Sequence, residues 1–310
     1  MSIVAEVLGF LQVLSDGSVE RFVPEIAPAS TDFSAEYFSK DVMIDPSKPI
    51  TARIFIPNAP ATSSARLPIL AYFHGGGFCI GSTTWLGYHH FLGDLCLVSQ
   101  CIVLSVDYRL APENRLPIAY EDCYASLEWL SRVSGTDPWL ERADLSRLFL
   151  SGDSAGANIA HHVAIRALQD ATCPVSITGL MSIHPYFGSE RRTEMESADK
   201  GGKTVGTNDL FWKLSIPEGS DRDYPGCNFE MARMSAEEWR RFPAVAVHVA
   251  ELDFLKERGV MYAEFLKGQG VKEVELVEAK GEQHVYHVYH PKSEVTSLLH
   301  KQMSHFMKRF

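Results

Sequence analysis

The chain has 310 residues, of which 45% are hydrophobic and 22% are charged, as is ordinary for a globular protein with a large core. Its formal net charge of -10 argues against binding to nucleic acid or to an anionic membrane surface. No apolar run is long enough to span a membrane, so we expect no membrane span and interpret residues 1–310 as one domain.

The first 45 residues precede the first clear strand, which is predicted at residues 52–56. The apolar residues Ile3, Val7, Phe10 and Leu11 follow a helical spacing and predict an amphipathic helix. This segment has neither a basic start nor a small-residue cleavage site, so no signal peptide is expected. The six cysteines include no Cys-x-x-Cys pair, which favours reduced thiols and a cytoplasmic location.

A buried strand is predicted at residues 67–73, and three consecutive glycines follow it after His74. Consecutive glycines cost conformational entropy, but they let backbone N–H groups approach a ligand without side chains in between. In an acyl-transfer enzyme, the N–H groups of Gly76, Gly77 and Ala155 would bind the oxyanion of the tetrahedral intermediate. No Walker lysine follows the glycines, so a phosphate-binding loop is not expected.

The segment from Gly152 to Gly156 reads Gly-Asp-Ser-Ala-Gly and lies between an apolar run and a helical run. In this context Gly-x-Ser-x-Gly is the pattern of a nucleophile elbow, a tight turn from a strand into a helix. Both glycines are needed because a side chain at either position would collide with the strand or the helix. Ser154 would then lie at a helix N-terminus, where an attacking alkoxide is stabilised. A glycine-rich turn with an incidental serine remains the alternative.

Predicted strands and helices alternate through the middle of the chain. The strands are expected at residues 102–106, 148–150 and 177–183, and the helices at residues 120–130 and 159–168. Such alternation is typical of a parallel sheet with helices on both faces, and it predicts an α/β fold. Residues 188–241 interrupt the pattern with charged, irregular sequence and a helical stretch at 208–214. We interpret residues 1–45 and 188–241 as two lid segments.

A carboxylate is expected at the carboxyl end of a strand predicted at residues 242–250. Three acids follow this strand, namely Glu251, Asp253 and Glu257. Glu257 is expected on the next helix, at residues 256–268. Asp253 and Glu251 both remain candidates for a catalytic acid, although Asp253 would also suit the N-cap of that helix.

A general base is expected after another strand, because the chain order in such folds is serine, acid and then histidine. The alternating sequence at residues 273–277 predicts this strand. A histidine-rich stretch with His284, His287 and His290 follows it. His284 lies in the strand-to-helix loop, so we predict it to be the base.

Several motifs together resemble those of one family. His74-Gly-Gly-Gly-Phe78, the heptapeptide Asp107-Tyr-Arg-Leu-Ala-Pro-Glu113 and the serine motif are similar to motifs of the hormone-sensitive-lipase group of α/β-hydrolases. Within that group the chain closely resembles the plant carboxylesterases related to the gibberellin receptor, with further matches at residues 16–21, 250–259 and 281–287. The resemblance implies an α/β-hydrolase fold and a triad of Ser154, Asp253 and His284.

The activity implied is that of a serine carboxylesterase. His284 would take the proton of Ser154, Asp253 would orient His284, and water would hydrolyse the acyl-enzyme. No metal or organic cofactor is expected, and His74 and Asp153 are expected to be structural. The expected partner is a small-molecule ester, and the chain is expected to be a monomer or a homodimer.

Aromatic side chains beside the motifs or in the lid segments are predicted to line an apolar pocket. These are Phe78, Trp85, Tyr88, Tyr186, Phe187, Trp212 and Tyr286. Such a pocket suits small to medium, mainly hydrophobic esters, with ordinary core packing as the alternative for each residue. A hormone receptor related to the gibberellin receptor is disfavoured because that receptor lacks the triad histidine. A lyase, cyclase or dehydratase of specialised metabolism is disfavoured by the intact loop of residues 75–77.

Overall fold

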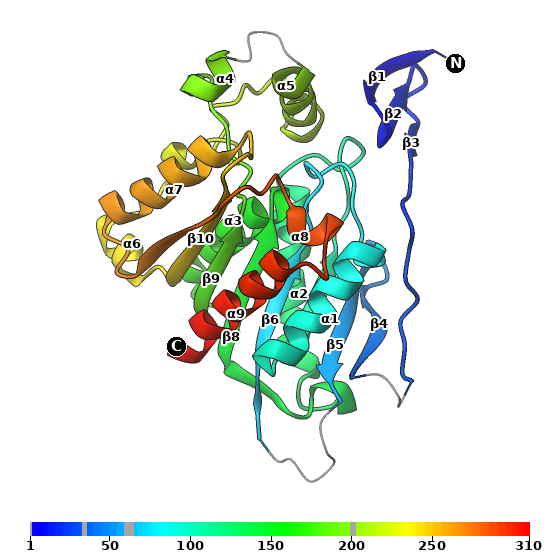
Figure 1. Cartoon of the computed structure of the whole chain (residues 1–310), viewed down its shortest axis with the longest axis vertical. Helices are drawn as coiled ribbons and strands as arrows, with labels where there is room; N and C mark the ends of the chain where they lie inside the picture. Colours follow the sequence, from blue (N-terminus) through cyan, green and yellow to red (C-terminus); the bar gives the residue numbers. More distant parts are fainter. Residues whose placement is uncertain (1, 33–35, 59–64, 199–202) are drawn as a thin grey trace.

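An eight-stranded mixed sheet is the centre of the computed structural model, which describes residues 2–32, 36–58, 65–198 and 203–310 (Figure 1). The strand order is β11-β10-β9-β8-β6-β7-β5-β4. Strands β11 to β7 in this order are parallel, whereas β5 is antiparallel to β7 and β4 to β5. The strands are β4 (Tyr37–Asp45), β5 (Ile50–Pro57), β6 (Leu67–Phe73), β7 (Ile102–Asp107), β8 (Ala143–Asp153), β9 (Ile177–Ile183), β10 (Ala244–Ala250) and β11 (Val274–Ala279).

Helices cover both faces of the sheet, so the central strands are apolar throughout. Every residue of β6 is buried. Ile69, Ala71 and Phe73 belong to the core cluster on the side of α2 (Ile118–Val133), α3 (Ala155–Gln169) and α7 (Lys256–Gln269). Leu70 and Tyr72 belong to the cluster on the side of α1 (Leu86–Ser99) and α9 (Glu294–Arg309). This two-residue alternation reflects the pleat of the strand.

The predicted middle of the chain is confirmed. The strands expected at 102–106, 148–150 and 177–183 lie within β7, β8 and β9, and the helices expected at 120–130 and 159–168 lie within α2 and α3. The α/β architecture follows from this alternation, as the sequence pattern indicates. The short helices α6 (Ala236–Arg241) and α8 (Tyr286–Tyr289) lie beside α7 and α1 respectively.

The predicted amphipathic helix at the N-terminus is wrong. Strands β1 (Ile3–Val7), β2 (Leu11–Leu14) and β3 (Val19–Arg21) form a small antiparallel sheet instead. Gly9 has a φ of 80°, which suits a turn between β1 and β2 and interrupts any helix there. Strand β4 also lies within the first 45 residues, but it forms the edge of the main sheet.

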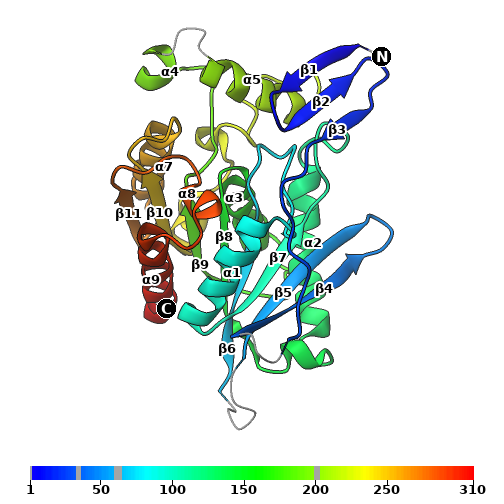
Figure 2. The ribbon, with the colours of Figure 1, turned by 45° about the vertical axis from the view of Figure 1, so that its right-hand side comes forward.

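The small sheet and the helices α4 (Glu194–Ala198) and α5 (Lys203–Ser215) all lie beyond the carboxyl ends of the parallel strands, as Figure 1 and Figure 2 show. We call β1–β3, α4 and α5 together the cover. Helix α5 contains the helical stretch predicted at residues 208–214. Within the described ranges, no helix has the length and apolar character that crossing a membrane requires.

Two arginines tie the cover to the body of the protein. Arg258 on α7 and Glu196 on α4 form a buried ion pair in which Nε and Nη2 donate to the carboxylate at 2.8 and 2.7 Å. Arg21 on β3 donates to the Glu113 carboxylate and to the carbonyl oxygen of Cys79, at 2.6 and 2.7 Å. The first tie is buried on both sides, whereas the second is partly exposed.

Candidate active site

A serine lies at the sharp turn between β8 and α3, as the pentapeptide predicts. Ser154 has a φ of 53°, which is rare for a residue with a side chain, and its N–H donates to the carbonyl oxygen of Ile183 at 2.9 Å. A Cβ at Gly156 would overlap the carbonyl oxygen of Phe73, and a Cβ at Gly152 would overlap the backbone of Gly156. Neither glycine has a positive φ. Both glycines are therefore required by close packing of the backbone.

Ser154, His284 and Asp253 form one hydrogen-bonded row. His284 Nε2 lies 3.0 Å from Ser154 Oγ, and His284 Nδ1 lies 2.7 Å from Asp253 Oδ2. The other carboxylate oxygen of Asp253 accepts a hydrogen bond from the N–H of Leu255 at 2.8 Å. This row has the order needed to move the serine proton onto the imidazole while a carboxylate fixes the ring.

The two competing acids lie elsewhere. Glu251 accepts a hydrogen bond from the N–H of Gly281, and Glu257, in the first turn of α7, accepts one from the N–H of Met195. Neither carboxylate bonds to His284. Helix α7 begins at Lys256 after Leu255 and has no side-chain N-cap bond, so Asp253 does not cap it.

Asp253 and His284 each favour the charged form of the other. Burial raises the pKa of Asp253, but the adjacent His284 lowers it more, so the net pKa lies below the ordinary value. Burial lowers the pKa of His284, but the Asp253 carboxylate outweighs this effect and the net pKa is raised. Both shifts stabilise an imidazolium beside a carboxylate, which is the charge state that forms when His284 accepts a proton.

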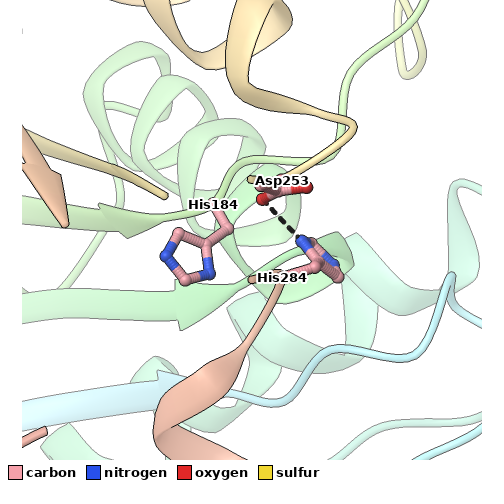
Figure 3. Close-up of side chains that lie close together, drawn as sticks. All are labelled: His184, Asp253 and His284. Carbon is pink, nitrogen blue, oxygen red and sulfur yellow. Dashed lines mark hydrogen bonds and ion pairs between the residues drawn. The ribbon is translucent and has the colours of Figure 1, made fainter. Parts of the chain in front are cut away.

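A second histidine, His184, lies beside the row, and Figure 3 shows it with Asp253 and His284. These three side chains offer ligand atoms within 4.8 Å of one another. However, Nδ1 of His184 accepts the N–H of Val285 at 2.9 Å, and both ring nitrogens of His284 are already bonded. The donor set therefore suits hydrogen bonding better than a metal ion. The sequence gives a weak signal for His184, which directly follows β9.

The glycine loop after β6 brings backbone N–H groups to the same place. Gly76 and Gly77 have φ values of 108° and 57°, and a Cβ on them would overlap Ile80 and the Phe211 ring respectively. Among the described residues, no protein acceptor is recorded for the N–H groups of Gly76, Gly77 and Ala155. Three donors are therefore available near Ser154 for an anionic oxygen.

A buried carboxylate holds this loop against the serine turn. Asp153 Oδ1 accepts hydrogen bonds from Tyr72 Oη at 2.7 Å and from the N–H of Gly75 at 3.1 Å, while Oδ2 accepts one from Tyr88 Oη at 2.9 Å. Burial raises the pKa of Asp153, and the two tyrosine hydrogen bonds oppose this effect. With its oxygens bonded in this way, Asp153 supports the loop and does not face Ser154 as a second base.

His74 is also bound within the loop. Its Nδ1 lies 2.8 Å from the carbonyl oxygen of Gly75, and its ring stacks on Tyr108 with a centroid distance of 4.4 Å. A Cβ on Gly81 would overlap the His74 ring. These contacts agree with the structural role expected for His74.

A cavity of about 610 Å³ opens above Ser154. Its walls include Ser154, His284, Asp253, Gly76 and Gly77. Most of the remaining walls are apolar. Such a cavity has the size and character of a small-molecule site.

Three of the seven aromatic residues predicted for the pocket line this cavity, namely Trp85, Tyr88 and Tyr186. Phe78, Phe187, Trp212 and Tyr286 do not, and this corrects the prediction. They are core residues because neighbouring side chains enclose them. Trp212, for example, stacks on the inner side of Tyr186 with a centroid distance of 4.3 Å.

Other residues of the wall were not expected from the sequence. Their apolar side chains include those of Phe10, Leu86, Phe211, Phe254, Val288 and Tyr289. Phe211 and Trp212 are adjacent on α5, so they point about 100° apart around the helix axis, and only Phe211 faces the cavity. The helical spacing indicates that Phe211 and Trp212 lie on different faces of α5, but it does not indicate which face lines the cavity.

Comparison with known proteins fits this geometry. A family model described as "alpha/beta hydrolase fold" matches residues 70–288. The chain belongs to this family. The plant protein "Probable carboxylesterase 6" of Arabidopsis thaliana is 40% identical to this α/β-hydrolase over 263 residues, which cover 82% of this chain and 77% of the relative.

Two further comparisons cover most of the α/β-hydrolase chain. "Tuliposide A-converting enzyme 1, chloroplastic" of Tulipa gesneriana is 35% identical over 312 residues, which cover 99% of this chain and 78% of the relative. The solved structure of EstE1, a thermophilic carboxylesterase cloned from a metagenomic library, has a TM-score of 0.74 and 26% identity, and covers 87% of this chain and 88% of EstE1. The expected family resemblance to plant carboxylesterases is thereby confirmed.

Proposed function

We propose that this α/β-hydrolase is a serine carboxylesterase that hydrolyses small to medium, mainly hydrophobic carboxylic esters. The observation that carries the proposal is the hydrogen-bonded row of Ser154, His284 and Asp253 at the floor of an apolar cavity. The carboxylesterase names of the plant relative and of the solved neighbour support ester hydrolysis as the reaction.

In the acylation step, His284 Nε2 takes the proton of Ser154 Oγ as this oxygen attacks the ester carbonyl carbon. The carbonyl oxygen becomes an oxyanion and accepts hydrogen bonds from the N–H groups of Gly76, Gly77 and Ala155. Asp253 holds Nδ1 of His284 and stabilises the imidazolium. The imidazolium then donates its proton to the leaving alkoxide, which departs as the alcohol.

In the deacylation step, a water molecule attacks the acyl group on Ser154, and His284 takes one proton from this water. The same three N–H groups bind the second oxyanion. His284 then returns the proton to Ser154 Oγ, and the acid leaves. No step in this sequence needs a metal or an organic cofactor.

The cover has the position of a lid over this reaction. Residues of β1, α5 and the segment before α1 line the cavity together with the row. Water exclusion by such a lid would favour attack by Ser154 over side reactions. We further propose that residues 1–310 act as one domain, as a monomer or a homodimer. The tulip relative is named as chloroplastic, so the cytoplasmic location stays a prediction.

The test is turnover of p-nitrophenyl esters from acetate to octanoate by wild type, Ser154→Ala and His284→Ala. Each substitution is expected to lower kcat by a factor of about 10⁴ or more, because it removes the nucleophile or its base. His290→Ala is the matched control, since His290 lies in the same histidine-rich stretch outside the cavity and should keep full turnover.

Circular dichroism and thermal unfolding of each variant establish that the fold is intact. Turnover that persists in both Ser154→Ala and His284→Ala would contradict the proposed roles. A folded wild type that hydrolyses no ester would contradict the esterase proposal itself and would favour a lyase or a binding protein.

A further inference from the structure

One helix of the cover presents a polar row to the otherwise apolar cavity. Thr204, Thr207, Asn208 and Phe211 all line the cavity from α5. Their spacing of three, four and seven residues places them on a single face of the helix. This face therefore changes from apolar at Phe211 to polar at Thr204.

Among these polar residues of α5, Asn208 gives the most information about a possible ligand. Only 7% of the residue is exposed, and this exposed part faces the cavity, because Asn208 lines the cavity and its amide atoms are not among the buried polar atoms that lack a partner in the described part of the chain. Its backbone carbonyl oxygen, by contrast, accepts the Tyr186 hydroxyl at 3.0 Å. An amide at the wall of an apolar cavity can form hydrogen bonds with a polar group of a bound ligand, which an apolar side chain of the same size could not do.

The polar residues on α5 are held at a defined place relative to Ser154. Tyr186 spans the gap, because its N–H donates to the carbonyl oxygen of Ser154 at 3.1 Å while its hydroxyl binds the backbone of Asn208. The Phe211 ring packs against Gly77 of the glycine loop. Along the helix axis, Asn208 lies about 4.5 Å and Thr204 about 10 Å from Phe211.

The charges of the cavity restrict what the polar row could bind. The wall contains the carboxylates of Asp153, Asp253 and Glu25, and among the described residues that line it there is no Lys or Arg. A carboxylate or phosphate on the ligand would therefore meet like charge without a lysine or arginine to pair with. Asn and Thr side chains both donate and accept hydrogen bonds, which matches a neutral hydroxyl group.

We propose that Asn208, with Thr204 and Thr207, forms a polar subsite that binds a neutral hydroxyl group of the ester substrate. This inference rests on the proposed esterase function and names its substrate class. The substrate is a mainly apolar ester whose hydroxyl group binds one to two turns of α5 away from Phe211, the residue that packs against the glycine loop. The hydroxyl belongs either to the acyl part or to the alcohol part, and the test separates the two.

The test compares matched pairs of esters that differ by one hydroxyl group. On the acyl side the pair is p-nitrophenyl hexanoate and p-nitrophenyl 6-hydroxyhexanoate. On the alcohol side it is hexyl acetate and 1,6-hexanediol monoacetate. The measured quantity is kcat/KM for the hydroxylated ester divided by kcat/KM for its parent. Wild type is expected to give a ratio well above one for one of the two pairs.

Asn208→Leu keeps the size of the side chain but removes its hydrogen bonds, and it is expected to lower that ratio about three- to tenfold. Thr204→Val with Thr207→Val is a second variant at exposed positions, which folding tolerates, and it should lower the ratio about threefold. Lys213→Met is the control, because Lys213 is an exposed residue of α5 outside the cavity wall.

A third ester, the p-nitrophenyl monoester of adipic acid, places a carboxylate where the hydroxyl would lie. Its kcat/KM is expected to be more than about tenfold below that of p-nitrophenyl hexanoate. Equal ratios in wild type and in both variants would overturn the subsite while leaving the esterase intact. The absence of turnover on every ester would instead overturn the proposed function.

Discussion

The floor of the site and its cover are built in different ways. The floor consists of the serine turn at residues 152–156, the glycine loop at 75–77, Asp253 and His284. Its backbone segments pack so closely that a single Cβ at Gly156 would overlap Phe73. In the cover, by contrast, β1 and the turn after it expose Val4 and Leu8 by 62% and 82%.

Side-chain contacts tie the cover to the body, among them those of Arg21 and Arg258. The geometry of the floor therefore depends on backbone packing, whereas the shape of the cavity depends on individual side-chain contacts of the cover. Substitutions in the two regions should therefore have different consequences, and three experiments test this difference.

The largest effect is expected in the floor, from Asp253→Asn. An amide does not stabilise the imidazolium and can hold His284 in the wrong tautomer, so kcat should fall by about 10³ to 10⁴. The pH profile should move as well. His284 must be deprotonated to act as a base, so wild-type kcat/KM falls as the pH drops below its pKa.

Because Asp253 raises this pKa above the ordinary value of 6.5, the acidic limb of the wild type should have its midpoint above pH 6.5. In Asp253→Asn the midpoint should shift to lower pH. Profiles of kcat/KM from pH 4.5 to 9 measure both quantities. If the midpoint in Asp253→Asn equals that of the wild type, a group other than His284 controls the acidic limb of the pH profile.

The next effect compares two glycines directly. Gly156→Ala should lower the free energy of unfolding by about 3 kcal/mol or more, because the new Cβ overlaps a backbone carbonyl oxygen that has little room to move. Gly206→Ala on α5 meets no atom within 4 Å and should be neutral or stabilise by up to about 1 kcal/mol. Urea unfolding measures both values, and similar costs for the two would remove the distinction between floor and cover.

A comparable loss of stability, without the accompanying damage to the serine turn, is expected where a buried ion pair anchors the cover. Arg258→Met should cost about 3–5 kcal/mol, because the Glu196 carboxylate would stay buried without its partner. Replacing both residues, with Arg258→Met and Glu196→Leu, should restore most of this loss. The control Arg309→Met breaks an exposed pair with Glu275 and should cost no more than about 1 kcal/mol. A double variant as unstable as the single one would argue against this explanation.

The floor could be predicted from the sequence because each part carries a short motif that can be recognised within one segment. The contacts that require the glycines are themselves long-range, since Gly156 packs on Phe73 and Gly77 on Phe211. His284 could be selected from three histidines because it lies in the loop after β11.

The cover could not be predicted in the same way. Ile3, Val7, Phe10 and Leu11 satisfy the spacing of a helix, but the turn at Gly9 and the pairing of β1 with β2 determine the actual structure. That pairing joins residues on either side of a turn, so helical spacing alone does not reveal it.

The aromatic residues of the cavity wall could not be predicted from the sequence either. Trp212 and Phe187 are completely buried in the core, whereas Phe211, one position away from Trp212, lines the cavity. An apolar side chain suits both environments equally well. Only the direction in which each helix or strand faces distinguishes them, and this direction depends on contacts far away in the sequence.

Asp153 joins the serine turn and the glycine loop in a way that bears on heat tolerance. Because its carboxylate binds Tyr72, Tyr88 and Gly75 while its backbone adjoins Ser154, one residue links the proposed nucleophile to the loop that carries Gly76 and Gly77. Warming that loosens the Arg21 contacts would leave this link unchanged. Near its melting temperature, the protein would then lose its discrimination between substrates before it loses its power to cleave a small, reactive one.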